Sequence, residues 1–223
     1  MQFRHELKQE ITYADMLILR PRLRAVMQQD THTIEGRYKI RSLYFDNLND
    51  KALKEKVDGV NIREKFRIRY YNGDTSLINL EKKSKINGLC RKEGVRLSIE
   101  QTEDILKGNY LWMSQSRECL IRELYFKVLH SGLHPKTIVD YVREPYIFGP
   151  GNVRVTMDYN IRTGLTATDF LNESCITIPI GDNPIILEIK WDEYLPDIVK
   201  DVIQLNHGRI GAFSKYAACR MYD

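Results

Sequence analysis

Lys65-Phe66-Arg67-Ile68-Arg69-Tyr70 is the stretch of sequence that decides the fold. Side chains along a β-strand point alternately to opposite faces. As a strand, this stretch has a basic face made by Lys65, Arg67 and Arg69, and an apolar face made by the alternate residues. Asn72-Gly73-Asp74 follows directly and is typical of a tight hairpin turn. A second, antiparallel strand is therefore predicted from residue 76.

The other segments predicted as strands show the same alternation. Their polar faces are Glu81, Lys83 and Lys85; Lys92 and Arg96; Tyr141 and Arg143; Arg154, Thr156 and Asp158; and Glu188 and Lys190. These faces are mostly basic with single acids among them, whereas the exterior of an ordinary domain mixes the two signs more evenly. Alternation alone leaves two arrangements open, because antiparallel sheets commonly turn their polar face to solvent.

The whole chain predicts a mainly antiparallel sheet with a few helices. Strands are expected over residues 3–9, 39–46, 64–71, 76–85, 94–99, 137–144, 153–160 and 185–191, helices over 12–29, 99–107, 116–131 and 196–205, and a short helix or extended tail over 213–221. Thr12 is the expected N-cap of the first helix, and Pro21 is expected to kink or split it. Asn87-Gly88 marks a second tight turn. With no internal repeat or linker, the prediction is one α+β domain over residues 1–223, built on a closed or strongly curled sheet.

The helices indicate which strand faces point inward. Leu120, Ile121, Leu124 and Val128 form an apolar stripe at helical spacing. If the apolar strand faces turned inward, such a helix would meet only charged strand faces outside. With the polar faces inward, the helices can pack on an apolar exterior. We therefore expect a β-barrel whose interior is a basic tunnel.

The composition excludes several classes of protein. At 43% hydrophobic and 29% charged residues the chain is of the soluble globular type, and no stretch approaches the roughly 18 to 20 apolar residues that span a bilayer. Residues 1–6 lack the apolar segment of a secretory signal. We expect a cytoplasmic protein with no direct membrane span, whose attachment to a membrane would need a membrane-protein partner.

Cysteine spacing and charge narrow the choice further. The four cysteines are scattered without a CxxC spacing, which argues against a zinc site. The net charge is only +4, and the sequence lacks a one-sided basic helix or an exposed aromatic platform. Nucleic acid is therefore not an expected partner. The sequence gives no indication of the oligomeric state.

A tunnel crowded with like charge repels itself and loses hydration, so it is reasonable only if an anion occupies it. Arginine donates two hydrogen bonds to one phosphate, while lysine serves as a compact point charge. The single acids would hold Mg²⁺ or Mn²⁺, which bind phosphates and one or two carboxylates together. The pattern thus predicts a binding site for ATP, another triphosphate or polyphosphate.

Six motifs in order along nearly the whole chain carry a resemblance to a known family. They are Leu43-Tyr44-Phe45-Asp46-Asn47, Phe66-Arg67-Ile68-Arg69-Tyr70-Tyr71-Asn72-Gly73, Leu80-Glu81-Lys82-Lys83, Val153-Arg154-Val155-Thr156-Met157-Asp158, Leu187-Glu188-Ile189-Lys190 and Phe213-Ser214-Lys215-Tyr216. With them the chain resembles the catalytic domain of the vacuolar transporter chaperone (VTC) proteins, within the triphosphate tunnel metalloenzymes, or CYTH-like superfamily. The resemblance implies an eight-stranded antiparallel tunnel barrel with helices packed outside. It also implies a polyphosphate polymerase that moves the terminal phosphoryl group of ATP onto a growing phosphate chain with Mn²⁺ or Mg²⁺.

The resemblance also assigns residues to roles. The implied phosphate-binding residues are Lys8, Arg67, Arg69, Lys83, Arg96, Arg143, Arg154 and Lys215, and the implied catalytic set is Arg67, Arg69, Lys83, Glu188 and Lys190. Glu188 is the implied metal ligand, with Glu81 and Glu6 as further acidic candidates. The opening Glu-x-Glu-x-Lys signature of the superfamily appears here as Arg4-His5-Glu6-Leu7-Lys8, so its first acid is missing. This departure fits the VTC branch better than the triphosphatases.

Three functions remain open within this fold. They are an ATP-dependent polyphosphate polymerase, a triphosphatase of inorganic or organic triphosphates, and a non-catalytic polyphosphate-binding subunit. The retention of Glu188 favours catalysis, because a pure binder needs the basic residues but not a metal ligand.

Overall fold

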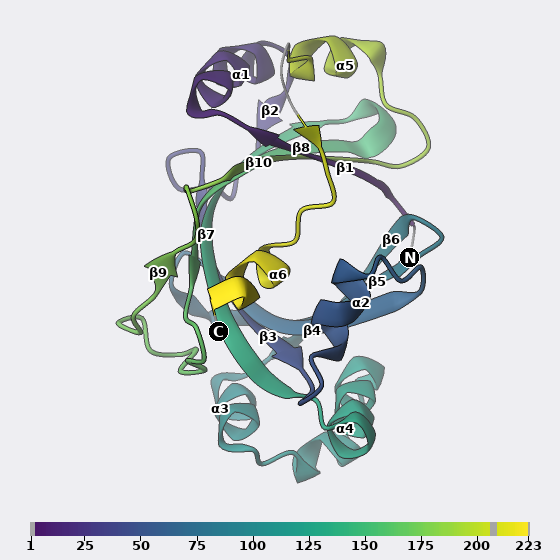
Figure 1. Cartoon of the computed structure of the whole chain (residues 1–223), viewed down its shortest axis with the longest axis vertical. Coiled ribbons are helices and arrows are strands. Elements are labelled where there is room, and N and C mark those ends of the chain that lie inside the picture. The colour runs from purple at the N-terminus through teal and green to yellow at the C-terminus, as the bar shows by residue number, and fades with distance from the viewer. Residues whose placement is uncertain (1–2, 206–208, 223) are drawn as a thin grey trace.

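Eight antiparallel strands curl into a ring in the computed structural model, which describes residues 3–205 and 209–222 (Figure 1). In ring order they are β1 (His5–Ile11), β10 (Ile185–Trp191), β8 (Val153–Thr163), β7 (His134–Phe148), β3 (Tyr38–Asp46), β4 (Arg63–Tyr71), β5 (Asp74–Ile86) and β6 (Leu89–Leu97). The short strands β2 (Gln28–Gln29), β9 (Ile178–Pro179) and β11 (Arg209–Ile210) pair with β7, β8 and β1. The predicted α+β class and eight-stranded antiparallel barrel are confirmed.

The ring closes where β6 meets the residue before β1. Arg4 and Cys90 form an isolated antiparallel bridge. Their two backbone hydrogen bonds measure 3.1 and 3.2 Å. By contrast, β1 pairs with β10 over seven residues. The closure is therefore a narrow seam between two otherwise continuous strands.

Helices lie on two sides of the ring and beside one of its openings (Figure 1). They are α1 (Tyr13–Val26) and α5 (Asp197–Ile203) on one side, α3 (Ile99–Lys107) and α4 (Cys119–Ser131) on the other, and α2 (Lys51–Val57) and α6 (Lys215–Cys219) beside the opening that faces the viewer. Short 3-10 helices cover Leu111–Gln115, Pro150–Asn152 and Arg220–Tyr222.

The apolar strand faces point outward and are covered by these helices. Ile68 and Leu80, on the outer faces of β4 and β5, are fully buried in one cluster with Leu124 of α4. On the opposite side, Val155 of β8 shares a cluster with Leu19 of α1. The expected inside-out arrangement is therefore confirmed, with these two apolar cores outside the ring and polar faces within it. A third cluster lies partly inside, because it includes Tyr44 and Tyr141 of the inner face together with Tyr216 of α6.

The first helix differs from its prediction. Thr12 caps it as expected, in a capping box with Asp15. The prediction that Pro21 splits the helix is wrong, because α1 runs unbroken to Val26. Pro21 and Leu17, whose carbonyl a proline cannot bond, are both exposed, so water can replace the missing hydrogen bond.

Both predicted hairpin turns are present. Asn72 and Gly73 have φ values of 53° and 76°, and Asn87 and Gly88 have values of 49° and 82°. Two successive positive φ values define the tight turn whose twist matches that of paired strands. The helix over 99–107 and the strand over 185–191 have their predicted bounds, whereas β6 begins at Leu89 rather than at residue 94.

Candidate anion-binding tunnel

A cavity of about 330 Å³ occupies the interior of the ring. All eight long strands contribute to its lining. In the described part of the chain, its charged lining consists of twelve basic residues and two acidic ones: Arg4, Lys8, Lys65, Arg67, Arg69, Lys83, Arg91, Lys92, Arg143, Arg154, Lys190 and Lys215, with Glu6 and Glu188. Eight of the twelve basic residues lie on the faces that strand alternation predicted, and Arg4, Lys8, Arg91 and Lys215 add to them.

Hydrogen bonds to neighbouring side chains hold Arg67 and Arg69 of β4. Arg67 donates from Nε to Glu81 at 2.8 Å and from Nη1 to the Tyr44 hydroxyl at 2.8 Å. Arg69 donates to Ser42 Oγ at 2.8 Å and to the Tyr141 hydroxyl at 2.9 Å. Burial opposes the ionisation of Glu81, but the two guanidinium groups outweigh it and keep its pKa below the ordinary value. Both arginines are therefore fixed in place before any ligand arrives.

Glu188 of β10 lies at the centre of a cluster of cations. Its carboxylate is 3.2 Å from Lys8 Nζ, 3.2 Å from Arg143 Nη2 and 3.0 Å from Lys190 Nζ. Glu188 is only 4% exposed. Burial alone would raise its pKa, but Lys190, then Lys8 and Arg143, lower it well below the ordinary value. The group is therefore an ionised carboxylate.

Two further acids, Asp158 and Glu6, lie next to this cluster. Asp158 of β8 is fully buried and accepts two hydrogen bonds from Arg143, at 2.6 and 2.7 Å. Lys215 Nζ of α6 lies 2.5 Å from the same carboxylate. Burial raises the pKa of Asp158, but Arg143 and Lys215 outweigh it and bring the value to about 2. Glu6 of β1 pairs with Lys83 at 2.6 Å.

Lys65 and Tyr44 are additional tunnel residues that the implied site set omits. Lys65 Nζ stands 5.3 Å from the centre of the Tyr44 ring, and in the described part of the chain no carboxylate lies within 4 Å of it. Burial, together with Lys83 and Lys8, lowers the pKa of Lys65 to about 7 against the opposing effect of Tyr44. Burial raises the pKa of Tyr44, yet Arg67 and Lys65 bring it to about 7. Strand alternation already placed Lys65 on the basic face. Tyr44 occurs in one of the family motifs, but nothing in the sequence indicated its role in the tunnel.

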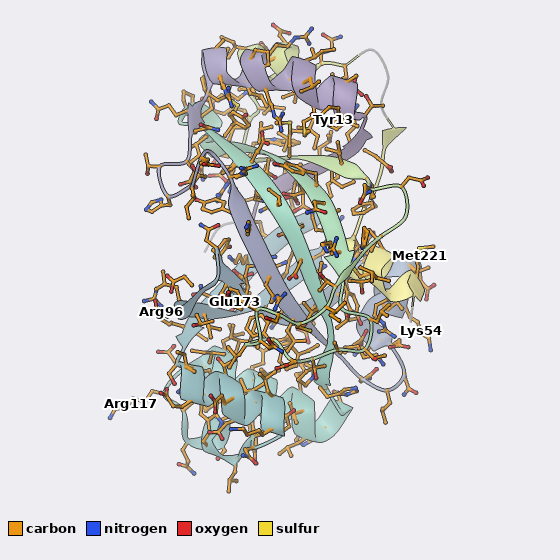
Figure 2. All side chains as sticks on the ribbon, turned by 90° about the vertical axis from the view of Figure 1, so that its left-hand side faces the viewer. Tyr13, Lys54, Arg96, Arg117, Glu173 and Met221 are labelled. Carbon is orange, nitrogen blue, oxygen red and sulfur yellow. The ribbon has the colours of Figure 1, made fainter. Side chains whose placement is uncertain are left out.

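The structure brings together all but one of the residues implied by the resemblance. Those lining the cavity are Lys8, Arg67, Arg69, Lys83, Arg143, Arg154, Lys215, Glu188, Lys190 and Glu6. Glu81 lies against Arg67, as described above. Arg96 does not line the cavity and is exposed at the periphery of the molecule (Figure 2). Arg96 pairs with Asn79, which is two residues from Glu81 along β5. Arg96 is therefore on the inner face of its strand, as predicted, but lies beyond the end of the cavity.

The acids of the tunnel fit a metal that is shared with phosphate. The described residues include no group of three or more His, Cys, Asp or Glu that could form a metal cage by themselves. Mg²⁺ commonly binds through one or two carboxylates together with phosphate oxygens. Glu188, with Glu6 as the nearest other acid of the lining, supplies that kind of oxygen donor.

A family model places the chain among known proteins. The VTC domain model matches residues 3–222. The chain belongs to the VTC domain family. No curated protein matches this VTC domain in sequence. None of its described helices combines the length and the apolar character needed to cross a membrane.

Two solved structures share the fold of this VTC domain. The PH1819 protein of Pyrococcus horikoshii OT3 has a TM-score of 0.51 at 14% identity, covering 97% of this chain and 95% of its own. A candidate adenylate cyclase of Bacillus halodurans has a TM-score of 0.53 at 12% identity, covering 85% and 80%. At these identities the likeness concerns the fold alone.

Proposed function

We propose that this VTC domain is a metal-dependent polyphosphate polymerase, which transfers the terminal phosphoryl group of ATP to a growing polyphosphate chain. The observation that carries the proposal is the tunnel lining, with twelve basic residues against two acidic ones in the described part of the chain. Glu81 and Asp158, behind the lining, pair with some of these cations. The excess that remains favours the binding of an anion of high charge density. A chain of phosphates has that charge density and the slender shape that a tunnel admits.

The arginines suit the chemistry of phosphoryl transfer. In a loose transition state, charge spreads over the equatorial oxygens of the transferred group, and positioning and electrostatic stabilisation supply most of the catalysis. Arg67 and Arg143 are held by Glu81 and Asp158, at 2.8 and 2.6 Å. These hydrogen bonds fix the guanidinium groups, so little reorganisation is needed when charge develops.

Glu188 would hold Mg²⁺ or Mn²⁺, with Glu6 as a second carboxylate. A metal held there would supply Lewis-acid chemistry and would offset negative charge that develops on the leaving group. Lys8, Lys190 and Arg143 contact Glu188 in this structure. Phosphate oxygens compete for these same cations, so an anionic substrate frees carboxylate oxygens for the metal.

The acceptor needs no general base if it is an ionised phosphate. A water acceptor would need an acid to orient it. Glu81 is poorly suited to that task, because its two oxygens contact Arg67 at 2.7 Å and Lys92 at 2.5 Å. This engagement favours phosphate over water as acceptor, and hence polymerisation over hydrolysis.

One incubation with ATP and Mn²⁺ separates the candidate functions. Chain length is followed on gels, together with ADP and free phosphate. Growing chains with matching ADP support the polymerase. Free phosphate without chains would make the protein a triphosphatase, and neither product would make it a binding subunit. Repeating the reaction with EDTA tests the metal requirement.

A further inference from the structure

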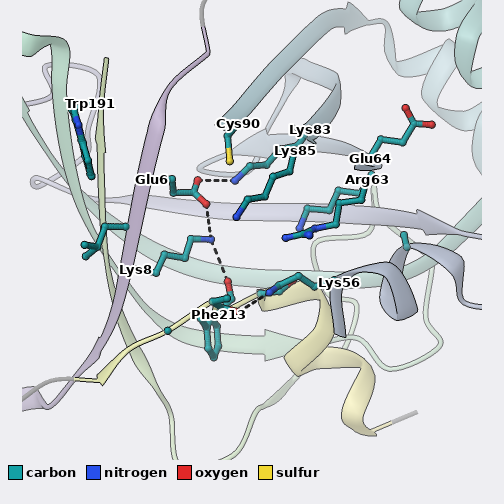
Figure 3. Close-up of a pocket in the computed structure, with 16 residues that line it drawn as sticks. Glu6, Lys8, Lys56, Arg63, Glu64, Lys83, Lys85, Cys90, Trp191 and Phe213 are labelled. Carbon is teal, nitrogen blue, oxygen red and sulfur yellow. Dashed lines mark hydrogen bonds and ion pairs between the residues drawn. The ribbon is translucent and has the colours of Figure 1, made fainter. Parts of the chain in front are cut away.

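The tunnel continues into a second cavity of about 490 Å³ (Figure 3). The two cavities adjoin, because they share Glu6, Lys8, Lys65, Lys83, Cys90 and Ser214 in their linings. Figure 3 shows Lys83 and Lys85 side by side above this space, with Lys8 across from them. The second cavity is therefore an extension of the tunnel toward one of its mouths.

Three cations surround the place where this extension reaches the surface. Lys56 of α2, Arg63 of β4 and Lys85 of β5 line the second cavity and also a surface hollow of about 570 Å³ outside it. Asn61 and Gly88 border the hollow and are exposed. We call Lys56, Arg63 and Lys85 the mouth triad.

The mouth triad has no acidic counterpart. In the ranges 3–205 and 209–222, no carboxylate lies within 4 Å of any of these three side chains. Lys56 donates to the carbonyl oxygen of Ala212 at 2.7 Å, and Arg63 donates to that of Val60. Burial and then the charges of Arg63, Lys8 and Lys85 lower the pKa of Lys56. The three groups thus repel one another, and Glu6, in the lining of the same cavity, offsets this repulsion at Lys56 only in part.

The opposite end of the tunnel is different. Arg63 begins β4 at the triad, and Tyr71 ends the same strand at the other end of the lining. At that end Lys92 pairs with Glu81 at 2.5 Å, and Arg154 pairs with Asp30 at 3.0 Å. One end of the tunnel is therefore charge-balanced and the other is not.

We propose that the mouth triad binds the phosphate units of an inorganic polyphosphate chain that extend out of the tunnel, so that the chain lies in one direction only. This inference rests on the proposed function, because it takes the tunnel to hold the chain end. Arginine can grip a phosphate with two parallel hydrogen bonds, and the two lysines add point charges on either side. Arg63 lies four residues from Arg67 along β4, which is roughly 13 Å at the rise of a β-strand. A long chain held among Arg67, Arg69 and Glu188 would therefore extend to the triad, whereas a triphosphate is too short to occupy both places.

The test compares two ligands on the full chain: inorganic tripolyphosphate and long-chain polyphosphate, each measured by titration calorimetry. The variant is Arg63→Ala with Lys85→Ala, which leaves the Lys56 contact to Ala212 intact. A matched control, Lys107→Ala with Arg117→Ala, removes the same charge from the exposed far side. We expect long-chain affinity to fall by about tenfold or more, since each charge-assisted hydrogen bond is worth at least that much. Tripolyphosphate affinity should stay within about twofold.

Salt dependence gives a second readout. Because fewer counterions are released, the slope of log affinity against log salt for the long chain should become shallower by roughly one to two. Unchanged long-chain affinity, or an equal loss for both ligands, would overturn the inference. The inference would also be overturned if single-stranded RNA displaced the bound long chain as effectively as added polyphosphate does. Failure of the wild-type chain to bind tripolyphosphate would instead refute the proposed function.

Discussion

Replacing Glu188 with Gln removes the negative charge at the centre of the tunnel while keeping the size of the side chain. Three cations lie 3.0 to 3.2 Å from this carboxylate. At an effective dielectric constant near 20, each such pair is worth about 5 kcal/mol before the cost of desolvation. After that cost, removing one partner of a buried ion pair destabilises a protein by about 3 to 5 kcal/mol.

The low end of that range applies here, because the cations keep other partners. Lys8 remains 3.4 Å from Glu6, and Arg143 keeps its two hydrogen bonds to Asp158. We expect a loss of about 3 kcal/mol in the free energy of unfolding. In a chain of 223 residues this corresponds to a melting temperature lower by about 6 to 12 °C.

Tripolyphosphate should reverse much of this loss, because its oxygens supply the missing negative charge. Melting curves with and without tripolyphosphate measure the effect. Glu144→Gln is the matched control: Glu144 is 6% exposed and contacts Arg20 at 2.6 Å outside the tunnel. Its variant should lose stability without gaining extra stabilisation from the ligand.

The same variant tests the metal role. Glu188→Gln should abolish turnover with ATP and Mn²⁺ while tripolyphosphate binding persists. Retained turnover would refute the role of Glu188 as metal ligand. If tripolyphosphate raised the melting temperatures of Glu188→Gln and Glu144→Gln equally, the ligand would not be replacing the negative charge of Glu188.

Three other substitutions test separate parts of the structure. The pKa of Lys65 is lowered to about 7 in the empty tunnel, and a bound anion favours its charged form, so tripolyphosphate affinity should fall as pH rises through about 7. Tyr44, whose pKa is also about 7, gains negative charge over the same range. Lys65→Arg should therefore flatten the pH dependence in a Tyr44→Phe background in calorimetry, and a profile unchanged from that of Tyr44→Phe would show that Lys65 does not contribute. Arg67→Ala should weaken tripolyphosphate binding by about 1.5 to 3 kcal/mol, as expected for a charge-assisted hydrogen bond; full affinity would remove it from the site. Leu124→Ala, at a fully buried position in α4, should cost about 2 to 5 kcal/mol in urea unfolding, and a parallel loss of ligand affinity would contradict the separation of core from tunnel.

Strand alternation and the helices' apolar stripes were enough to predict the inside-out ring. Both signals are local: a period of two along a strand and of 3.6 along a helix. Arg96 shows what these local patterns do not predict. Its face was predicted correctly, but its distance past the rim depends on how far β5 and β6 extend together, which the sequence does not state.

Other features depend on contacts between distant segments. The helix α2 was not predicted, because it has no buried residue and no apolar stripe. Its first amides are bound by Asp46, which accepts hydrogen bonds from Ala52 at 2.9 Å and Leu53 at 3.1 Å. The pKa of Tyr44 is likewise lowered because Arg67 and Lys65, more than 20 residues further along the chain, are folded against it.

The placement of the apolar cores outside the ring bears on how such a protein can diverge. The side chains of the two outer cores and the charged side chains that face the lumen share strands but have largely different neighbours. Substitutions without shared partners act almost additively on stability. Lumen residues outside the buried ion pairs can therefore change one at a time while the shell preserves the fold. The retention of this fold at 12 to 14% identity in two solved structures is consistent with such freedom.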